Sequence, residues 1–219
     1  MSQEIDVLLV DDHAVVRTGY KAYLSLSDDI GEIYEAERGE VACQVYSQFQ
    51  PHVVIMDLSM PGIGGLESIR RMLFRDPDCK ILVFSIYNDT IFVIRALNAG
   101  AKGYITKNSK PDILIAAVRQ VAAGNTFIDP TLTHELAAHL AINGKKDDGS
   151  LKLLSPREFD VFCLLARGMT SRDIAEKLCL SYKTVCNHTT SVKDKLNIKT
   201  LAELSLLAIR EGIIETAQP

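Results

Sequence analysis

Runs of apolar residues alternate with amphipathic stretches through residues 1–124. The apolar runs are short and rich in Val, Ile and Leu, which predicts β-strands, and the stretches between them have the spacing of helices with one buried face. We expect strands near residues 6–11, 30–36, 52–57, 80–86 and 102–106, and helices near 13–27, 39–49, 65–75, 90–99 and 110–123. Strand–helix units in this order predict an α/β domain with a five-stranded, doubly wound parallel sheet that helices cover on both faces.

The hydrophobic pattern changes after residue 124. A further helix is expected from Pro130 to about Ala141, and residues 143–150 contain no apolar side chain, which predicts a flexible linker. Beyond the linker the apolar positions have helical spacing only. We therefore expect an α/β domain at residues 1–124, a linker with a short helix at 125–150, and a small all-α domain at 151–219.

Local start and stop signals divide the all-α segment into helices. Ser155, Pro156 and Glu158 are an N-cap, a first helical residue and a capping-box acid, so one helix should run from there to about residue 167. Others are predicted at 171–178, at 182–196 with Ser181 as N-cap, and at about 201–210. A short helix, a tight turn and a capped helix are typical of a helix-turn-helix, whose second helix can enter a major groove. A plain four-helix bundle is the alternative.

The composition is ordinary for a globular protein, and it narrows the class. The chain has 219 residues, of which 47% are hydrophobic and 24% charged, which is long enough for two modest domains. No run approaches 18 consecutive apolar residues and the N-terminus is acidic, so we expect no membrane span, no signal peptide and a cytoplasmic protein.

Charge and cysteine content add two further expectations. Residues 151–219 hold 10 basic and 8 acidic residues, whereas residues 1–150 hold 14 and 20, so the second domain is weakly basic. This balance is compatible with nucleic-acid binding without demonstrating it. The five cysteines are scattered and form no C-x-x-C pair, which favours reduced, buried thiols over a disulfide or zinc framework.

Acidic and polar side chains follow the predicted strands at the points where they end. Asp11 and Asp12 end the first strand, Asp57 the third and Ser85 the fourth, and Lys107 follows the fifth. The carboxyl ends of parallel strands meet at one edge, which is where open α/β sheets bind ligands. Three uncompensated carboxylates would raise one another's pKa, so a hard divalent cation is the natural partner, and Mg²⁺ fits best because it takes oxygen ligands.

This arrangement predicts phosphoryl chemistry. Asp57 would be the nucleophile that accepts phosphate as an acyl phosphate, Lys107 would neutralise a phosphoryl oxygen, and the Ser85 hydroxyl would donate to another. The alternative for Asp57 alone is an N-cap of the following helix.

Residues 1–124 resemble the receiver domain of two-component response regulators, through Asp11-Asp12, Asp57, Met60-Pro61-Gly62, Ser85, Tyr104 and Lys107. The resemblance implies that a sensor histidine kinase phosphorylates Asp57. It also implies Asp12 and Asp57 as direct Mg²⁺ ligands together with the Ser59 carbonyl, and Asp11 as a ligand through water.

The same resemblance implies that Ser85 and Tyr104 form a switch pair. The serine moves towards the phosphate, and the aromatic ring turns inward into the vacated space, so that phosphorylation shifts the population of states. One departure from the family is visible. Many receivers have a Pro in a cis bond after the lysine, whereas Asn108 follows Lys107 here, which leaves the geometry of that loop open.

The all-α segment resembles the LuxR-type DNA-binding domain of the NarL/FixJ family. The similarity lies in Leu154-Ser155-Pro156-Arg157-Glu158, Leu165-Ala166-Arg167-Gly168, Asp173-Ile174-Ala175, Leu178, Leu180-Ser181, Lys183-Thr184-Val185, His188 and Lys195-Leu196. The ending of the chain is also similar to the GacA/UvrY subgroup.

The LuxR resemblance implies DNA contacts along the helix that begins near Tyr182. Lys183 and Thr184 should meet phosphate, and residues one to two turns further on should reach base edges. Cys186 stands where a Lys is usual, which removes a cation, while Asn187 suits adenine and Thr190 a thymine methyl. The remaining candidate DNA contacts are His188, through packing or phosphate, and Lys193 and Lys195, through phosphate.

Together these patterns predict a phosphorylation-switched transcription regulator rather than an enzyme. It would bind promoter DNA as a homodimer, act on RNA polymerase and have no contact with membranes. The apolar face of Leu201, Leu204, Leu207 and Ala208 suits either that dimer or the core of its own domain.

Two other functions stay open from the sequence. One is a haloacid-dehalogenase-type phosphatase, although that family has a second Asp two residues after the nucleophile, where this chain has Ser59. The other is a receiver that works as a protein-interaction module with a helical domain that no longer binds DNA.

Overall fold

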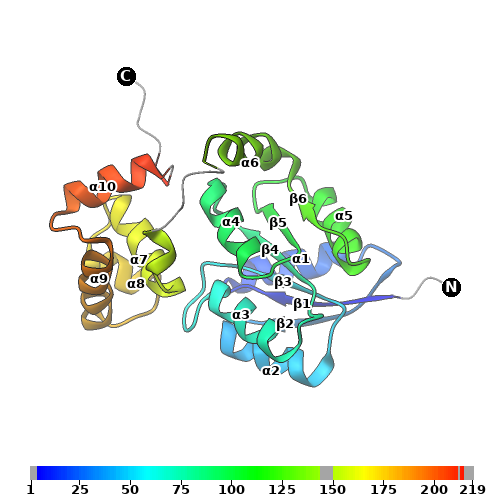
Figure 1. Ribbon diagram of the computed structural model, residues 1–219. Coiled ribbons are helices and arrows are strands. Elements are labelled where there is room, and N and C mark those ends of the chain that lie inside the picture. The colour runs from blue at the N-terminus through cyan, green and yellow to red at the C-terminus, as the bar shows by residue number, and fades with distance from the viewer. Residues whose placement is uncertain (1–3, 144–149, 212, 215–219) are drawn as a thin grey trace. The chain divides into compact units, whose positions relative to one another are not determined.

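The computed structural model describes residues 4–143, 150–211 and 213–214, which fold into two compact units, an N-terminal α/β unit and a C-terminal helical unit (Figure 1). The first unit is built on one parallel sheet in the strand order β2-β1-β3-β4-β5-β6. Its strands are β1 (Ile5–Val10), β2 (Ile30–Ala36), β3 (Val53–Met56), β4 (Ile81–Ser85), β5 (Gly103–Thr106) and β6 (Phe127–Ile128).

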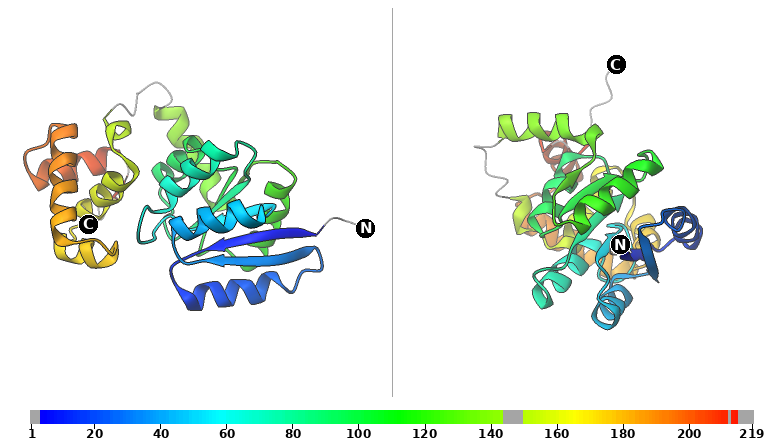
Figure 2. Two further views of the ribbon diagram at one scale, coloured as in Figure 1. Left: turned by 90° about the horizontal axis from the view of Figure 1, so that it is seen from below. Right: turned by 90° about the vertical axis from the view of Figure 1, so that its right-hand side faces the viewer.

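Helices cover both faces of this sheet (Figures 1 and 2). They are α1 (Ala14–Leu24), α2 (Gly39–Phe49), α3 (Gly65–Arg75), α4 (Thr90–Asn98) and α5 (Pro111–Ala122), and α6 (Pro130–Asn143) follows β6. Val7, Leu9, Val53 and Ile55 pack in one core with Leu24 of α1 and with Leu114, Ala117, Val118 and Val121 of α5. The intervening residues Leu8, Val54 and Met56 are equally buried. Both faces of the sheet are therefore buried from solvent. Because residues on either side of each strand must be apolar, the strands appear in the sequence as continuous apolar runs.

The predicted fold class is confirmed, with one correction to the number of strands. The sequence predicts five strands, but β6 pairs with β5 as a sixth strand in the segment that was expected to be linker. Phe127 and Ile128 are too few residues to show a period of their own, so only their pairing to Gly103 and Tyr104 reveals the strand. The domain boundaries at 124 and 150 stay a prediction, and most of the predicted flexible linker, residues 144–149, lies outside the described residues.

The second unit follows the predicted helix pattern closely. After a 3₁₀ turn η1 (Leu151–Leu153), it contains α7 (Pro156–Ala166), α8 (Ser171–Lys177), α9 (Tyr182–Leu196) and α10 (Leu201–Arg210). Ser155 and Glu158 form the expected capping box, and Ser181 caps α9 by accepting the Thr184 N–H at 3.0 Å. Ile174, Leu178, Val185 and Val192 are buried between these helices.

Two glycines of the α/β unit differ in whether the surrounding atoms leave room for a side chain. Gly65, the first residue of α3, lies against the end of β3, and a Cβ at this position would lie 2.1 Å from the Asp57 carbonyl oxygen. Gly19 lies inside α1, where a Cβ would meet nothing within 4 Å. The first glycine is required by packing, whereas the second only weakens its helix.

Gly65→Ala should therefore lower the free energy of unfolding of the α/β unit by about 1–3 kcal/mol, because backbone must move to admit a methyl group. Gly19→Ala, the matched control, should raise it by about 0.5–1 kcal/mol through helix propensity. Native-state hydrogen exchange in β3 and β4 measures both values. Equal effects of the two substitutions would contradict the packing argument.

Candidate phosphoryl site and helix-turn-helix

Main-chain hydrogen bonds bring the polar strand ends together at one edge of the sheet. The Asp57 N–H donates to the Val10 carbonyl at 3.0 Å, and the Lys107 N–H donates to the Ser85 carbonyl at 2.8 Å. Each bond joins the residue after one strand to the last residue of its neighbour. The register of the parallel ladder therefore sets the positions of these side chains, as expected for the carboxyl edge of an open α/β sheet.

One ammonium group is shared by two buried carboxylates at this edge. Lys107 Nζ lies 2.5 Å from Asp11 Oδ2 and 2.6 Å from Asp57 Oδ2. Asp11 is 1% exposed and Asp57 3%. Burial raises the pKa of Asp57 above its ordinary value, and the nearby Lys107 opposes that rise without cancelling it. Burial alone would lower the pKa of Lys107, but Asp57 and Asp11 outweigh it and the pKa is raised. Lys107 is thus a cation at neutral pH.

Asp12 adds a third carboxylate with an unsatisfied oxygen. Its Oδ1 is buried and accepts no hydrogen bond, although Nδ1 of His13 lies 2.9 Å away. Among the described residues, Asp11, Asp12 and His13 bring their side-chain donor atoms within 4.8 Å of one another. Three carboxylates against one lysine leave an excess of negative charge in an oxygen-rich site. This donor set fits a hard divalent cation.

Asp57 does not cap the following helix, so that alternative is wrong. The N-cap of α3 is Gly64, and Asp57 Oδ1 instead accepts the Ser59 N–H at 3.2 Å in the loop that follows the strand. The peptide bond between Lys107 and Asn108 is trans, which answers the question about this loop.

Ser85 ends β4 and Tyr104 lies in β5, the strand paired with it, and both side chains are fully buried. The Tyr104 ring is turned inward, and its hydroxyl donates to the Tyr87 carbonyl at 2.7 Å. Ser85 Oγ accepts the Tyr87 N–H at 3.3 Å. Both residues of the predicted switch pair therefore contact the main chain of Tyr87, in the loop that leads from β4 to α4.

In the second unit, α8 and α9 form a helix-turn-helix. The turn between them contains Cys179 in a left-handed conformation with φ of 49°. Thr170 and Asp173 form a capping box at the start of α8. Because caps hold both helix starts, the angle between the helices is set by local chemistry as well as by their shared core.

The exposed face of α9 carries part of the predicted DNA-contact set. Lys183, Asn187 and Thr190 are exposed and follow one another at intervals of four and three residues, so they share one side of the helix. Thr184, Cys186, His188 and Lys193 are half-buried. The Thr190 hydroxyl donates to the Cys186 carbonyl at 3.1 Å, which leaves mainly its methyl group for a partner.

Lys195 is engaged within its own domain. Its ammonium lies 2.6 Å from Glu158 Oε2, and Ser191 Oγ donates to Glu158 Oε1 at 2.6 Å. Burial alone would raise the pKa of Glu158, but hydrogen bonds from Lys195, Ser191 and Ser155 lower it to about 2. A lysine paired in this way is the weakest of the predicted phosphate contacts. Burial lowers the pKa of His188, so this side chain is neutral at pH 7.

Two family profiles together match most of the chain. The profile described as "Response regulator receiver domain" matches residues 7–119, and the one described as "Bacterial regulatory proteins, luxR family" matches residues 152–208. The chain is a response regulator with a LuxR-type DNA-binding domain. Members of this family are transcription regulators rather than enzymes, which excludes the phosphatase alternative.

Full-length relatives agree with both profiles. The oxygen regulatory protein NreC of Staphylococcus carnosus is 41% identical over 95% of this chain and 99% of its own. The response regulator GacA of Pseudomonas aeruginosa is 37% identical over 97% and 99%. A structure of RcsB from Salmonella enterica serovar Typhimurium, bound to the promoter rprA with the phosphomimetic BeF₃⁻, is 26% identical over 93% and 98%, with a TM-score of 0.62. NreC matches at least as well as GacA does, so these identities do not distinguish the GacA/UvrY subgroup from relatives of NreC.

Sequence reasoning missed two residues at the acidic edge of this regulator. His13 donates its N–H to Asp11 Oδ1 at 2.8 Å, and Arg17 Nη1 donates to the Asp11 carbonyl at 2.6 Å. Their position in the sequence could have indicated this, because both residues follow the Asp11-Asp12 pair within one or two helical turns.

The structure favours one of the two alternatives for the apolar face of α10, and it corrects the expectation that all cysteines of the regulator are buried. Leu204 and Ala208 are fully buried in their own unit, so they belong to its core, whereas Leu201 is 53% exposed. All five cysteines are free, as predicted, but they are not all buried, because Cys179 is exposed and Cys43 and Cys186 are half-buried. No helix within the described ranges is long and apolar enough to cross a membrane.

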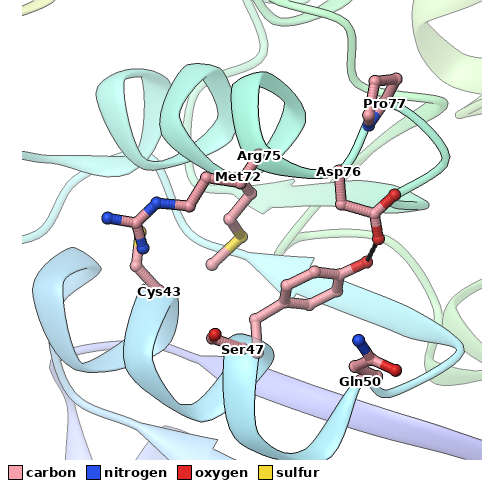
Figure 3. A pocket seen from close by; sticks show the side chains of 8 residues that line it. Cys43, Ser47, Gln50, Met72, Arg75, Asp76 and Pro77 are labelled. Carbon is pink, nitrogen blue, oxygen red and sulfur yellow. Dashed lines mark hydrogen bonds between the residues drawn. The ribbon is translucent and has the colours of Figure 1, made fainter.

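The receiver also contains a pocket of about 370 Å³ between α2 and α3 (Figure 3). Met72 and Tyr46 line it, and the Tyr46 hydroxyl donates to Asp76 Oδ2 at 2.5 Å. None of the predicted phosphoryl-site residues contributes to its lining. The pocket is therefore separate from the acidic edge.

Glu158→Gln should destabilise the helical unit by about 2 kcal/mol at pH 7, because charge-assisted hydrogen bonds are lost. The folded-state pKa of about 2 lies below the ordinary 4.5, so the stabilisation by ionised Glu158 is complete above pH 4.5 and disappears as the pH falls through 2. Hydrogen exchange in α7 and α9 should show parent and variant converging over that interval. Glu176→Gln, an exposed control on α8, should have no such effect; a pH-independent gap would rule out the charge mechanism.

Proposed function

We propose that Asp57 is the phosphoacceptor of this response regulator and that a sensor histidine kinase is its phosphodonor. The observation that carries the proposal is the buried Asp57 carboxylate, held at the sheet edge by Lys107 beside Asp11. An Asp57 oxygen attacks the phosphorus, and the bond from phosphorus to the kinase histidine breaks, leaving the electron pair on the imidazole, which takes up a proton. Lys107 then balances the charge of a phosphoryl oxygen in place of the lost carboxylate charge.

Asp11, Asp12 and Asp57, with the Ser59 carbonyl, would hold Mg²⁺. The unsatisfied Asp12 oxygen and the excess of carboxylates support this assignment. When bound, the cation supplies positive charge to the phosphoryl oxygens and orients them for transfer. Asp11 already accepts Lys107 and the His13 N–H, which agrees with a role for this carboxylate through water.

Ser85 and Tyr104 act as the switch pair in this proposal. In this proposal the Ser85 hydroxyl donates to a phosphoryl oxygen on Asp57, whereas in the present structure its Oγ accepts the Tyr87 N–H. Tyr104 already occupies an inward position. Phosphorylation therefore favours one of two packings of the loop from β4 to α4.

The regulator binds promoter DNA through α9. Lys183 and Thr184 contact phosphate at its N-terminal turn, and Asn187 reads a base edge from the exposed face. Cys186, His188, Thr190, Lys193 and Lys195 complete the set of proposed contacts. The promoter complex of the related RcsB supports DNA binding by a chain of this domain order.

The remaining assignments follow from this role. The domain at 1–124 carries out phosphoryl transfer, and the domain at 151–219 binds DNA. Residues 125–150 join the two. Two copies of the chain bind paired half-sites as a homodimer and act on RNA polymerase. A regulator of promoters works in the cytoplasm.

Labelling with acetyl phosphate in Mg²⁺ tests the acceptor. Asp57→Asn should take up no phosphate, because the nucleophile is gone, and Asp12→Asn should slow uptake about 10–100-fold by weakening the metal site. Asp28→Asn, an exposed control, should label like the parent. Label on the Asp57→Asn chain would overturn the assignment.

Titration with genomic DNA fragments at two salt concentrations tests the interface. Lys183→Ala should weaken binding to all sequences and reduce the slope of log affinity against log salt by about 1, since one phosphate contact is lost. Asn187→Ala should cost about 1–3 kcal/mol on the preferred sequence only. Lys102→Ala, which removes an exposed charge from the receiver, is the control. Absence of salt-dependent binding by the parent would favour the protein-interaction alternative.

A further inference from the structure

Asp129 is a fully buried carboxylate between β6 and α6 that takes no part in the proposed phosphoryl site. Its Oδ1 accepts the Thr131 N–H at 3.0 Å and the Thr131 hydroxyl at 2.8 Å, in the first turn of α6. Its Oδ2 accepts the Thr106 N–H at 3.2 Å and the Ser109 hydroxyl, at the end of β5. One carboxylate therefore joins two segments that are separated in the chain.

The segment on the Oδ2 side is the turn that carries Lys107. The Ser109 N–H donates to the Thr106 carbonyl at 3.1 Å, and the two hydroxyls hydrogen-bond at 2.7 Å, so residues 106–109 form a closed turn. Lys107 leaves this turn to reach Asp57 at 2.6 Å. A movement of the Lys107 ammonium can therefore pass through the turn formed by Thr106 and Ser109 to Asp129, to which both residues are hydrogen-bonded.

The segment on the Oδ1 side is the start of the helix that leads towards the DNA-binding domain along the chain. The Asp129 N–H also donates to the carbonyl of Tyr104 at 2.8 Å. Burial alone would raise the pKa of Asp129, but hydrogen bonds from Ser109, Thr131 and Thr106 outweigh it, and the pKa lies below its ordinary value. An ionised carboxylate with no solvent exposure depends on all of its donors, so the turn and the helix start cannot separate without leaving it unsatisfied.

We infer that Asp129 is a positioning residue that couples the Lys107 turn to the first turn of α6, so that phosphorylation of Asp57 is transmitted to the helix that leads into the DNA-binding domain. This inference rests on the proposed function, because Lys107 must respond to the phosphoryl group. The device needs a shift of only about 1 Å in the turn, which is enough to lengthen a hydrogen bond beyond its useful range. Ser109 supplies the side-chain bond on the turn side, next to the main-chain bond from Thr106.

Hydrogen exchange of the full-length chain, with and without acetyl phosphate in Mg²⁺, tests the coupling. In the parent, phosphorylation should change exchange at residues 131–136 by about fivefold or more. Ser109→Ala removes the side-chain bond on the turn side but keeps the Thr106 N–H bond and the Thr131 bonds at the start of α6. This variant should still label at Asp57, while the change at 131–136 falls below about twofold. Thr133→Val, which removes a hydroxyl bonded only to the Asp129 carbonyl, should respond like the parent.

A purely structural role would raise exchange equally in both phosphorylation states and leave their ratio unchanged. Asp129→Asn keeps the side-chain size. As in Ser109→Ala, the ratio of exchange at 131–136 with and without phosphorylation should fall below about twofold. A parent-like ratio in both variants would overturn the inference, as would a labelled parent whose exchange at 131–136 does not change. A parent that takes up no label would instead overturn the proposed function itself.

Discussion

The charge balance at the carboxyl edge of the sheet is the constraint on which the receiver depends. Two carboxylates that are almost fully buried share one ammonium, with bonds of 2.5 and 2.6 Å. Loss of Lys107 from such a buried cluster would cost about 3–5 kcal/mol, because the carboxylates would be left without a compensating charge. The site is thus held together by Lys107 and still has more negative than positive charge. It is poised to respond to any group that changes this balance, whether a cation or a phosphoryl group.

The strand ends make that balance a property of the whole sheet. Asp57 and Lys107 are each bonded through their N–H groups to the last residue of a neighbouring strand, so the ladder sets where both side chains begin. Movement is left to the loops, where Tyr87 accepts from Tyr104 and Asp129 accepts from Ser109. A rigid sheet edge with bonded loops is a suitable arrangement for converting a local change of charge into a change of packing.

The helical unit solves a different problem, which is to present one helix face to a polyanion. Glu158 completes the capping box of α7 and binds Ser191 and Lys195 of α9, so a single carboxylate joins α7 to the helix proposed to face DNA. The ammonium of Lys195 is paired with Glu158 and is therefore less available to contact a DNA phosphate. With Cys186 at a position where lysine is usual, the proposed DNA contacts would depend more on the exposed Lys183 and Asn187, and base readout would carry more weight relative to phosphate attraction.

The sequence by itself determined the features that depend on local patterning. Apolar runs ending in Asp11, Asp57 and Ser85 predicted the parallel sheet and its polar edge, because both faces of each strand are buried and the polar residues begin where the core ends. Capping signals at Ser155 and Ser181 located two of the helix starts, because caps are made within four residues.

Only the tertiary structure decided the features that join distant parts of the chain. Lys195 meets Glu158 across 37 residues, Ser109 meets Asp129 across 20, and β6 exists only through its pairing with β5. The same holds for the apolar positions of α10, where Leu204 is buried and Leu201 exposed although both fit one predicted face. Periodicity identifies a helix and its apolar residues, but which of them meet the core depends on how neighbouring helices are placed, and no local pattern contains that information.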